Sequence, residues 1–258
     1  MMRLRTLIVE DSRLARAELR RLLDNHPEVE VVGEAANADE AELFIPDLQP
    51  DLLLLDIQMP GRNGFELLEA LDSVPLVIFT TAYSEFAVKA FEMNALDYLV
   101  KPVQEDRLAK ALQKAEQAAI QLGLDQPGAS QREPREGDVE AGASRTLLKG
   151  TDRVFVKDGE HCWFVPLAEV RLLEVEGNYT RLYFGTHQPL VPKTLNYLES
   201  RLDPQIFFRA SRQHLVNLNW VKDVEPWFSG SLRLVLRSGQ QVEVSRRQAQ
   251  RFRDLMSL

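Results

Sequence analysis

The chain has 258 residues, of which 45% are hydrophobic and 27% are charged, and its formal net charge at pH 7 is −8. This composition excludes a disordered chain, and no apolar run approaches the roughly 18 residues that a membrane span needs. At one to two hundred residues per domain, we expect two domains. The first apolar stretch runs into Glu10 and Asp11, unlike a signal peptide, and Cys162 is the single cysteine. We therefore expect a cytoplasmic protein without a disulfide or a membrane partner.

Charge and composition divide the chain into three parts. Residues 1–125 hold 12 Lys and Arg against 23 Asp and Glu, whereas residues 146–258 hold 16 against 12. Between these parts, residues 123–145 include four Gly, two Pro and two Ser and almost no large apolar side chain. Such a segment cannot bury enough surface to fold by itself. The sequence predicts one domain over residues 1–122, a flexible linker over 123–145 and a second domain over 146–258.

Buried strands alternate with helices in the first domain. Its apolar runs lack period-two alternation, which indicates strands buried on both faces. Helical periodicity follows these runs, as at residues 86–91, and a closing helix covers residues 108–119. Five consecutive strand-helix units predict an α/β fold with a doubly wound parallel sheet. The five strands lie near residues 7–9, 29–32, 52–55, 76–79 and 98–100.

The second domain shows the opposite pattern. Leu232, Leu234 and Leu236 alternate with polar residues, and this period of two is typical of half-buried strands. Glycine-containing turns separate the short strands, which predicts a mostly antiparallel β domain. We expect its strands near residues 154–156, 162–165, 172–175, 181–184, 232–236 and 242–244, and helices over 194–202 and 246–256.

Charged and polar side chains follow the strands of the first domain. Glu10 and Asp11 follow the first strand, and Asp56 follows the third. The carboxyl ends of parallel strands meet at one edge of a doubly wound sheet, so these three carboxylates gather there. They repel one another unless a hard divalent cation lies among them, and oxygen ligands suit Mg²⁺. The sequence therefore predicts a magnesium site at this edge.

The same edge holds the groups needed to accept a phosphoryl group. Asp56 can attack as the nucleophile, Lys101 can neutralise charge on the phosphoryl oxygens, and Thr81 can donate a hydrogen bond. Taken singly, an Asp after a strand is more often a cap, and a lone Lys is usually a solvated charge. Four strand ends that supply the right groups in the right order outweigh that interpretation. Thr80 beside Thr81 leaves the choice of hydroxyl open.

Two pairs of arginines stand out in the second domain. Arg209 and Arg212 lie between apolar runs, and Arg246 and Arg247 fall in the first turn of the last predicted helix. Cations are unfavourable at a helix N-terminus, and a phosphate or a base edge would compensate them. A surface salt-bridge network explains the arginines equally well, so the residues alone leave nucleic-acid binding open.

The first domain resembles the receiver domain of two-component response regulators, over residues 4–121. The resemblance is carried by Leu7-Ile8-Val9-Glu10-Asp11, Leu54-Leu55-Asp56-Ile57-Gln58-Met59-Pro60, Thr81-Ala82 and Asp97-Tyr98-Leu99-Val100-Lys101-Pro102-Val103. It implies a flavodoxin-like fold in which a sensor histidine kinase phosphorylates Asp56. It also implies Mg²⁺ ligands from Glu10, Asp11, Asp56 and the backbone carbonyl of Gln58, and a switch pair formed by Thr81 and Tyr98.

The second domain resembles the LytTR-type DNA-binding domain, over residues 147–258. The resemblance is carried by Leu173-Glu174-Val175-Glu176-Gly177-Asn178-Tyr179-Thr180, Phe207-Phe208-Arg209-Ala210-Ser211-Arg212, Leu215-Val216-Asn217 and Ser245-Arg246-Arg247. It implies that loops, rather than a recognition helix, enter the major groove of double-stranded DNA. The implied DNA contacts are Asn178, Tyr179 and Thr180 in one loop, Arg209, Ser211, Arg212 and Gln213 in a second, Arg246 and Arg247 in a third, and Lys193 on a phosphate.

Together these features predict a phosphorylation-controlled transcription regulator that forms a homodimer on activation. We expect no catalysis beyond self-phosphotransfer and slow autodephosphorylation. One alternative is a signalling adaptor whose β domain binds protein or RNA. Another is a Mg²⁺-dependent phosphatase, but such enzymes commonly carry a second acid two positions after the nucleophile, where this chain has Gln58.

Overall fold

The computed structural model describes residues 3–82, 95–122, 147–159 and 161–256. The chain forms two compact units, Met1–Gly142 with His161–Phe164, and Ala143–Glu160 with Val165–Leu258. The predicted linker and the helix expected at residues 86–91 lie outside the described residues. Within the part of the chain that the structure describes, no helix is both long and apolar enough to cross a membrane.

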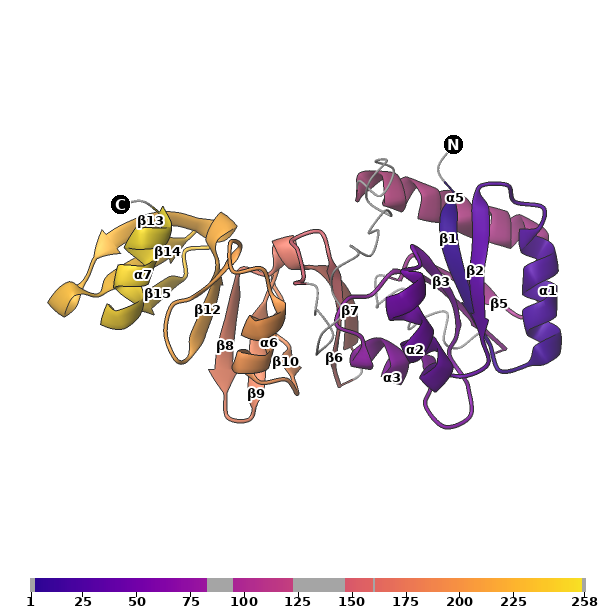
Figure 1. The fold of residues 1–258 in the computed structure, drawn as a ribbon, viewed down its shortest axis with the longest axis horizontal. Coiled ribbons are helices and arrows are strands. Elements are labelled where there is room, and N and C mark those ends of the chain that lie inside the picture. Colours follow the sequence, from indigo (N-terminus) through magenta and orange to yellow (C-terminus); the bar gives the residue numbers. More distant parts are fainter. Residues whose placement is uncertain (1–2, 83–94, 123–146, 160, 257–258) are drawn as a thin grey trace, which may run out of the picture. The chain divides into compact units, whose positions relative to one another are not determined.

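The N-terminal unit is built on a five-stranded parallel sheet with the order β2-β1-β3-β4-β5. Figure 1 shows this sheet with its helices. The doubly wound fold predicted from the sequence is confirmed. The elements are β1 (Leu4–Val9), α1 (Arg13–Leu23), β2 (Val29–Ala35), α2 (Ala38–Leu48), β3 (Leu52–Asp56), α3 (Gly64–Ala70), β4 (Leu76–Thr81), β5 (Asp97–Val100) and α5 (Glu105–Gln121).

The central strands are buried on both faces because they are covered by helices on each side. Every residue of β3 and β4 is buried, which explains why neither strand alternates in sequence. On one face, Leu54 and Ile78 pack with Leu19 from α1 and Leu112 from α5 in one apolar cluster. This packing fixes the strands in register, so that their carboxyl ends meet at one edge.

The C-terminal unit is mostly antiparallel, as the alternating pattern predicts. One sheet has the order β10-β9-β8-β12-β11, and a second has the order β13-β14-β15. The elements are β6 (Arg153–Asp158), the last two residues of β7 (His161–Pro166), β8 (Leu172–Glu176), β9 (Tyr179–Tyr183), β10 (Leu190–Val191), α6 (Leu195–Arg201), β11 (Phe207–Arg209), β12 (His214–Asn217), β13 (Val221–Pro226), β14 (Leu232–Leu236), β15 (Gln241–Val244) and α7 (Arg246–Met256), with short 3₁₀ turns at Leu167–Glu169, Leu218–Trp220 and Phe228–Gly230.

Helix α7 closes the core of this unit. Its buried residues are Ala249 and Phe252, and the Phe252 ring lies 5.2 Å from the ring of Phe208 in an edge-on arrangement. The leucines of β14 that alternate in sequence point into the same cluster. Because α7 is held by these contacts, its first residue, Arg246, occupies a fixed position beside the sheets.

Candidate functional site

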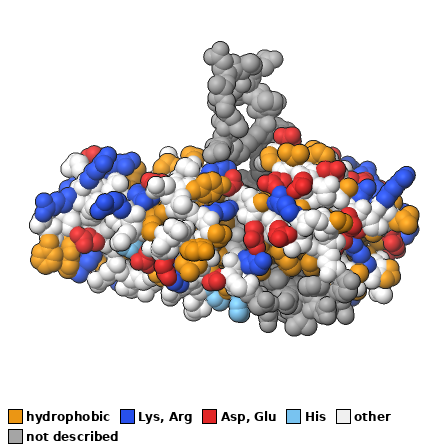
Figure 2. All heavy atoms as spheres, turned by 90° about the horizontal axis from the view of Figure 1, so that it is seen from below, with side chains coloured by type: hydrophobic (Ala, Val, Ile, Leu, Met, Phe, Trp, Pro, Cys, Tyr) orange, Lys and Arg blue, Asp and Glu red, His pale blue; other side chains and the backbone are white. Residues whose placement is uncertain are grey.

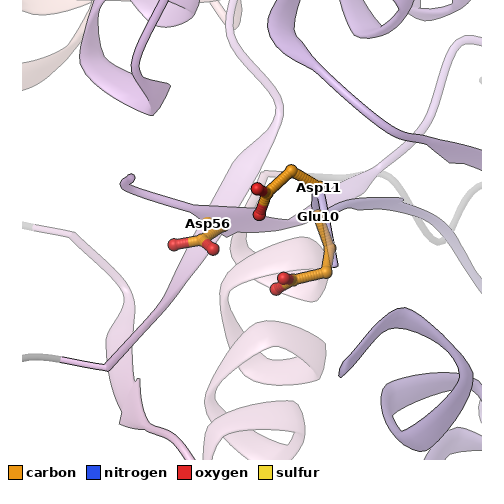
Figure 3. A group of neighbouring side chains, drawn as sticks. All are labelled: Glu10, Asp11 and Asp56. Carbon is orange, nitrogen blue, oxygen red and sulfur yellow. The ribbon is translucent and has the colours of Figure 1, made fainter. Parts of the chain in front are cut away.

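The three predicted carboxylates come together at the carboxyl edge of the parallel sheet. Glu10 and Asp11 follow β1, and Asp56 ends β3. One ligand oxygen from each lies within 4.8 Å of the others, and Figure 3 shows the three side chains at this edge. Glu10 and Asp56 are buried, whereas Asp11 is exposed. The cluster is therefore mostly shielded from water but open on one side.

Lys101 joins two of these carboxylates. Its Nζ atom lies 2.6 Å from Oδ2 of Asp56 and 2.5 Å from Oε2 of Glu10, and its side chain is 20% exposed. Its backbone amide donates to the carbonyl of Thr81, which fixes it beside the end of β4. Burial opposes the charge on Lys101, but the hydrogen bonds to Asp56 and Glu10 outweigh it and raise the pKa of this ammonium group.

The environment of Glu10 favours a further cation at this edge. Burial, and then the negative charge of Asp56, raise the pKa of Glu10, and the bonds from Lys101 offset this only in part. A divalent cation among the three carboxylates would relieve the same repulsion. All the donors are hard oxygens, and Asp11 is open to solvent, so the group fits Mg²⁺ with water completing its shell. Gln58 lies beside the cluster, and its backbone N–H donates a hydrogen bond to Oδ1 of Asp56 at 3.0 Å.

Gly64 is a residue of this site that the sequence reasoning missed. A Cβ atom at this position would lie 2.5 Å from the backbone oxygen of Asp56 and 3.3 Å from the Cα of Ile57. The amide of Gly64 donates to the carbonyl of Ile57. The start of α3 therefore presses against the segment that carries Asp56, and only glycine allows this approach. The sequence signal was the Asn63-Gly64 pair, in which Asn63 caps α3.

The candidate switch residues lie next to this cluster. Thr80 and Thr81 are both fully buried at the end of β4, and Thr80 is the register partner of Asp56. Tyr98 lies in β5 and is also buried. The structure therefore brings both threonines to the carboxyl edge. The assignment of Thr81 and Tyr98 as the switch pair stays a prediction.

In the C-terminal unit, strand pairing brings three loops to one edge. Strands β8 and β9 are antiparallel, so the Gly177-Asn178 turn lies at the end of β8. The start of β12 pairs with the same end of β8, and the amide of Val175 donates to the carbonyl of Gln213 at 2.9 Å. The amide of Ser245 donates to the carbonyl of Ala210 at 2.9 Å. The turn, the loop over residues 210–213 and the start of α7 therefore share one edge.

Most of the residues predicted to bind DNA are exposed on this edge. Figure 2 shows Lys and Arg side chains gathered over the C-terminal unit, at the left of the view. Lys193 is half-buried, with Nζ 5.8 Å from the centroid of the Tyr197 ring. Ser211 is also half-buried, and its hydroxyl accepts from the amide of Gln213. The exposed residues are Asn178, Tyr179, Arg212, Gln213, Arg246 and Arg247.

Tyr179 and Thr180 do not lie in a loop, contrary to the prediction, because both belong to β9. Thr180 is also fully buried, and its hydroxyl donates to the carbonyl of Lys193 at 2.7 Å. Since its one side-chain donor is already bound inside the protein, its side chain does not reach the surface. The Thr180 side chain ties β9 to the segment that follows β10, which places Lys193 at the same edge as the turn.

Arg209 also differs from the prediction, because it lies in β11 and its side chain is only 12% exposed. Its guanidinium donates to the carbonyls of Ser211 at 2.6 Å and Arg212 at 2.8 Å. It also pairs with Glu199 of α6 at 2.7 Å. These bonds use the donors that would otherwise meet DNA. Arg209 therefore braces the loop and presents Arg212 instead of reaching outward itself.

A polar network that the sequence reasoning missed holds the same loop from the other side. Tyr183 donates its hydroxyl to Glu174 at 2.5 Å, and the Nε2 atom of His214 lies 3.3 Å from the other oxygen of Glu174. The Nδ1 atom of His214 lies 3.1 Å from the hydroxyl of Ser211. Burial and then the bond to Glu174 raise the pKa of Tyr183 to about 12. No local sequence pattern predicts this network, because its members come from three strands and a loop.

Comparisons with known proteins match both units. A family described as the response regulator receiver domain matches residues 6–113, and the LytTr DNA-binding domain matches residues 160–257. The "Sensory transduction protein LytT" of Enterococcus faecalis is 32% identical over 257 residues, which covers 98% of each chain. The "Transcriptional regulatory protein YpdB" of Escherichia coli is 31% identical over 259 residues, which covers 99% of this chain and all of that protein.

Solved structures include a similar C-terminal domain. The LytTr DNA-binding domain of a putative methyl-accepting/DNA response regulator from Bacillus cereus is 26% identical, with a TM-score of 0.40. It covers 41% of this chain and 97% of that chain. The full-length relatives and the two family matches agree with the architecture of the two units. The chain belongs to the response regulators that combine a receiver domain with a LytTr DNA-binding domain, a family of phosphorylation-controlled DNA-binding regulators.

Proposed function

We propose that Asp56 accepts a phosphoryl group from a sensor histidine kinase and that this controls binding of the C-terminal domain to promoter DNA. The observation that carries the proposal is the position of Lys101, whose Nζ atom bonds both Asp56 and Glu10 at an edge that also holds Asp11. This arrangement combines a nucleophilic carboxylate, a fixed cation and further oxygen ligands. Those are the groups that phosphoryl transfer to a protein carboxylate requires.

In the proposed transfer, a carboxylate oxygen of Asp56 attacks the phosphorus atom, and the phosphorus–nitrogen bond of the donor histidine breaks. The imidazole leaves with the bonding electron pair and takes up a proton. Lys101 stabilises charge on the phosphoryl oxygens, and Thr81 donates a hydrogen bond to one of them. Glu10, Asp11, Asp56 and the carbonyl of Gln58 are the proposed Mg²⁺ ligands. Mg²⁺ would neutralise charge on the transferred group.

We propose that the DNA-facing edge consists of exposed and half-buried side chains at the three loops, together with Lys193. In this proposal Arg212 and Arg246 pair bidentately with guanine, and Arg247 and Lys193 contact phosphates. Asn178, Tyr179, Ser211 and Gln213 complete this surface. Arg209 and Thr180 support it from inside.

The proposed function also includes dimerisation of the protein and the division of the chain into two tethered domains. Receivers pair on phosphorylation, so that two tethered C-terminal domains bind adjacent DNA sites with greater avidity. The domains extend over residues 1–122 and 146–258, joined by a linker over 123–145, and the protein acts in the cytoplasm, where the DNA is. The family match favours DNA binding over the adaptor and phosphatase alternatives. The only catalysis proposed is self-phosphotransfer and slow autodephosphorylation.

The test of this proposal removes the nucleophile and keeps its shape. Asp56→Asn should abolish the mobility shift that acetyl phosphate with Mg²⁺ produces on a phosphate-affinity gel. Asp47→Asn, an exposed position on α2, is the matched control and should shift like the wild type. Selection of DNA from a random pool, with and without the phosphoryl donor, tests whether the C-terminal domain binds DNA. A retained shift in Asp56→Asn would contradict the assignment of Asp56 as the acceptor. If no DNA sequence is enriched, the DNA-binding proposal is wrong.

A further inference from the structure

An aromatic side chain projects from the C-terminal domain at the turn between β13 and β14. Phe228 is 74% exposed, compared with 50% for Tyr179, which the proposed function already places on DNA. Apolar side chains of this size are normally buried at least in part, and the core of this unit takes in Phe207, Phe208 and Phe252. The exposure of Phe228 therefore calls for a physical reason.

The turn that carries Phe228 is closed by its own hydrogen bonds. The amide of Trp227 donates to the carbonyl of Ser231, and the amide and hydroxyl of Ser231 both donate to the carbonyl of Phe228. Ser229 has φ 57° and Gly230 has φ 83°, so the turn uses backbone conformations that most side chains avoid. These bonds fix the backbone of the turn, and the Phe228 ring stands exposed on it.

Trp227 and Arg233 brace the same turn. The Trp227 ring packs edge-on against Phe228 with centroids 4.7 Å apart, and the guanidinium carbon of Arg233 lies 3.9 Å over Trp227. Arg233 is itself paired with Glu225 across β13 and β14. The ring is thus presented on a prearranged support, which lowers the entropy lost when a partner binds it.

Strand register places this turn at the edge already assigned to DNA. Pro226 pairs with Leu232, and Leu232 pairs with Val244 on the next strand. The turn between β13 and β14 therefore lies at the end of β15 that leads through Ser245 into Arg246. The short turn that contains Phe228 also contacts α7. The turn that carries Phe228 consequently lies near α7, at the end of the sheet from which α7 starts.

The surroundings of the turn favour a nucleic acid over another protein. Residues 221–256 carry seven Lys and Arg against four Asp and Glu, and Arg246 and Arg247 are exposed at the start of α7. A protein interface needs an apolar patch of several hundred Å², which a single projecting ring does not supply. An apolar ring beside cations suits the groove of a duplex, where apolar side chains contact sugars and base edges while arginines hold the backbone.

We infer that Phe228, backed by Trp227, is a further contact of this domain with double-stranded DNA, packing against sugars and base edges beside the segment that Arg246 contacts. This inference rests on the proposed DNA-binding function. It extends that function to a turn that lies outside the sequence motifs carrying the resemblance to LytTR domains. The contact is apolar, so it adds affinity without neutralising a phosphate. It therefore predicts a loss of affinity that does not change the salt dependence of binding.

The experiment compares full-length variants on a duplex that carries a site selected by the wild-type protein. Phe228→Ser should weaken binding about tenfold or more. It should also remove hydroxyl-radical protection on one side of the footprint and leave the slope of affinity against salt unchanged. Phe228→Tyr keeps a ring and should bind within about twofold of the wild type. Leu255→Ala removes another exposed apolar side chain, 45% exposed near the far end of α7, and is the control, which should bind normally.

The outcomes separate this inference from the proposed function. If Phe228→Ser binds like the wild type while Arg246→Ala loses affinity, the inference is wrong and DNA binding stands. If Phe228→Ser changes the mass measured by light scattering but not the DNA affinity, the ring joins two copies of the chain and the inference is again wrong. If the wild-type protein enriches no DNA sequence, the proposed function fails, and the inference fails with it. Circular dichroism melting should show that Phe228→Ser remains folded, because an exposed ring contributes little to the core.

Discussion

The Nζ atom of Lys101 lies 2.6 Å from Oδ2 of Asp56, and the same atom lies 2.5 Å from Oε2 of Glu10. One cation therefore bridges the carboxylates that end two neighbouring parallel strands. Because both carboxylates are buried, this bridge offsets a repulsion that water does not screen. A phosphoryl group on Asp56 would place new negative charge directly beside Lys101, so the bridge couples the chemistry of the site to the end of β5.

Lys101→Met removes the bridging cation and keeps most of the side-chain volume. In metal-free buffer at pH 7, we expect the free energy of unfolding to fall by about 1–3 kcal/mol, because Glu10 and Asp56 are left unpaired. Mg²⁺ should raise the melting temperature of the variant more than that of the wild type, since the ion then relieves a larger repulsion. Lys110→Met, at an exposed position on α5, is the control for loss of a positive charge. An unchanged melting temperature and an equal response to Mg²⁺ would show that the bridge contributes nothing.

Paired valine substitutions distinguish Thr80 from Thr81. The hydroxyl of Thr80 is buried and has no hydrogen-bond partner among the described residues, so Thr80→Val should leave stability unchanged or raise it by about 1 kcal/mol. Thr81→Val removes the hydroxyl proposed to meet the phosphoryl group. We expect Thr81→Val to become phosphorylated on the gel but to lose the effect of phosphorylation on DNA affinity, whereas Thr80→Val keeps it. The reverse result would assign the switch to Thr80.

Arg212→Ala and Arg246→Ala test the DNA-facing edge. Both side chains are exposed, so their removal should leave the melting temperature unchanged. Each should weaken binding to the selected duplex by about 10–100-fold, the usual range for loss of a bidentate base contact. Arg209→Ala should behave differently, because it deletes bonds to the loop carbonyls and to Glu199. We expect it to lower both the melting temperature and the affinity. If Arg209→Ala weakened binding without destabilising the domain, its assignment as an internal brace would be wrong.

Asp97→Asn tests the anchor at the start of β5. Asp97 accepts from the amide of Tyr98 and pairs with Lys114 at 2.9 Å and Arg107 at 3.2 Å. Burial raises the pKa of Asp97, but the bonds from Lys114, from the Tyr98 amide and from Arg107 outweigh it and lower the pKa overall. We expect the substitution to reduce the free energy of unfolding at pH 7 by about 1–2 kcal/mol, since Asn can still accept the hydrogen bond from the Tyr98 N–H but lacks the negative charge.

The pH dependence of this effect has a defined sign. Because folding lowers the pKa of Asp97, its carboxylate stabilises the folded chain above the ordinary value of about 4, and this contribution disappears as the pH falls through the lowered pKa. The difference in melting temperature between wild type and Asp97→Asn should therefore be largest near neutral pH and shrink below about pH 4. A difference that stayed constant down to pH 3 would show that the ion pairs are not its source.

Much of the acidic site proposed to accept the phosphoryl group could be predicted from local sequence. Glu10, Asp11, Asp56, Thr81 and Lys101 each follow a continuous apolar run, and the carboxyl ends of parallel strands meet by necessity. Gly64 was missed because its importance comes from a close approach to the backbone of Asp56, which no periodicity encodes. The residues of the site that lie at strand ends could therefore be predicted from the sequence, because the topology of the sheet alone brings them together.

The DNA-facing edge was harder to predict. The sequence predicted Thr180 in a loop and Arg209 among the DNA contacts, but both lie in strands and are largely shielded from solvent. In an antiparallel sheet, adjacent residues point to opposite faces, so Tyr179 is exposed while Thr180 is buried. Which of two neighbours faces out depends on the packing beneath them. Thr180 bonds to Lys193, and Arg209 bonds to Asn196 and Glu199, and each of these partners is distant in the sequence.

By itself, the sequence determined the two fold classes, the acidic edge and the contrast in charge between the domains. Those features follow from hydrophobic periodicity and from residue types at strand ends, which act over a few residues. Only the tertiary structure decided which arginine braces a loop and which reaches outward, and that the turn with Phe228 lies against α7. Those outcomes depend on strand register and on hydrogen bonds between segments far apart in the chain, and their energies are set when the segments pack together.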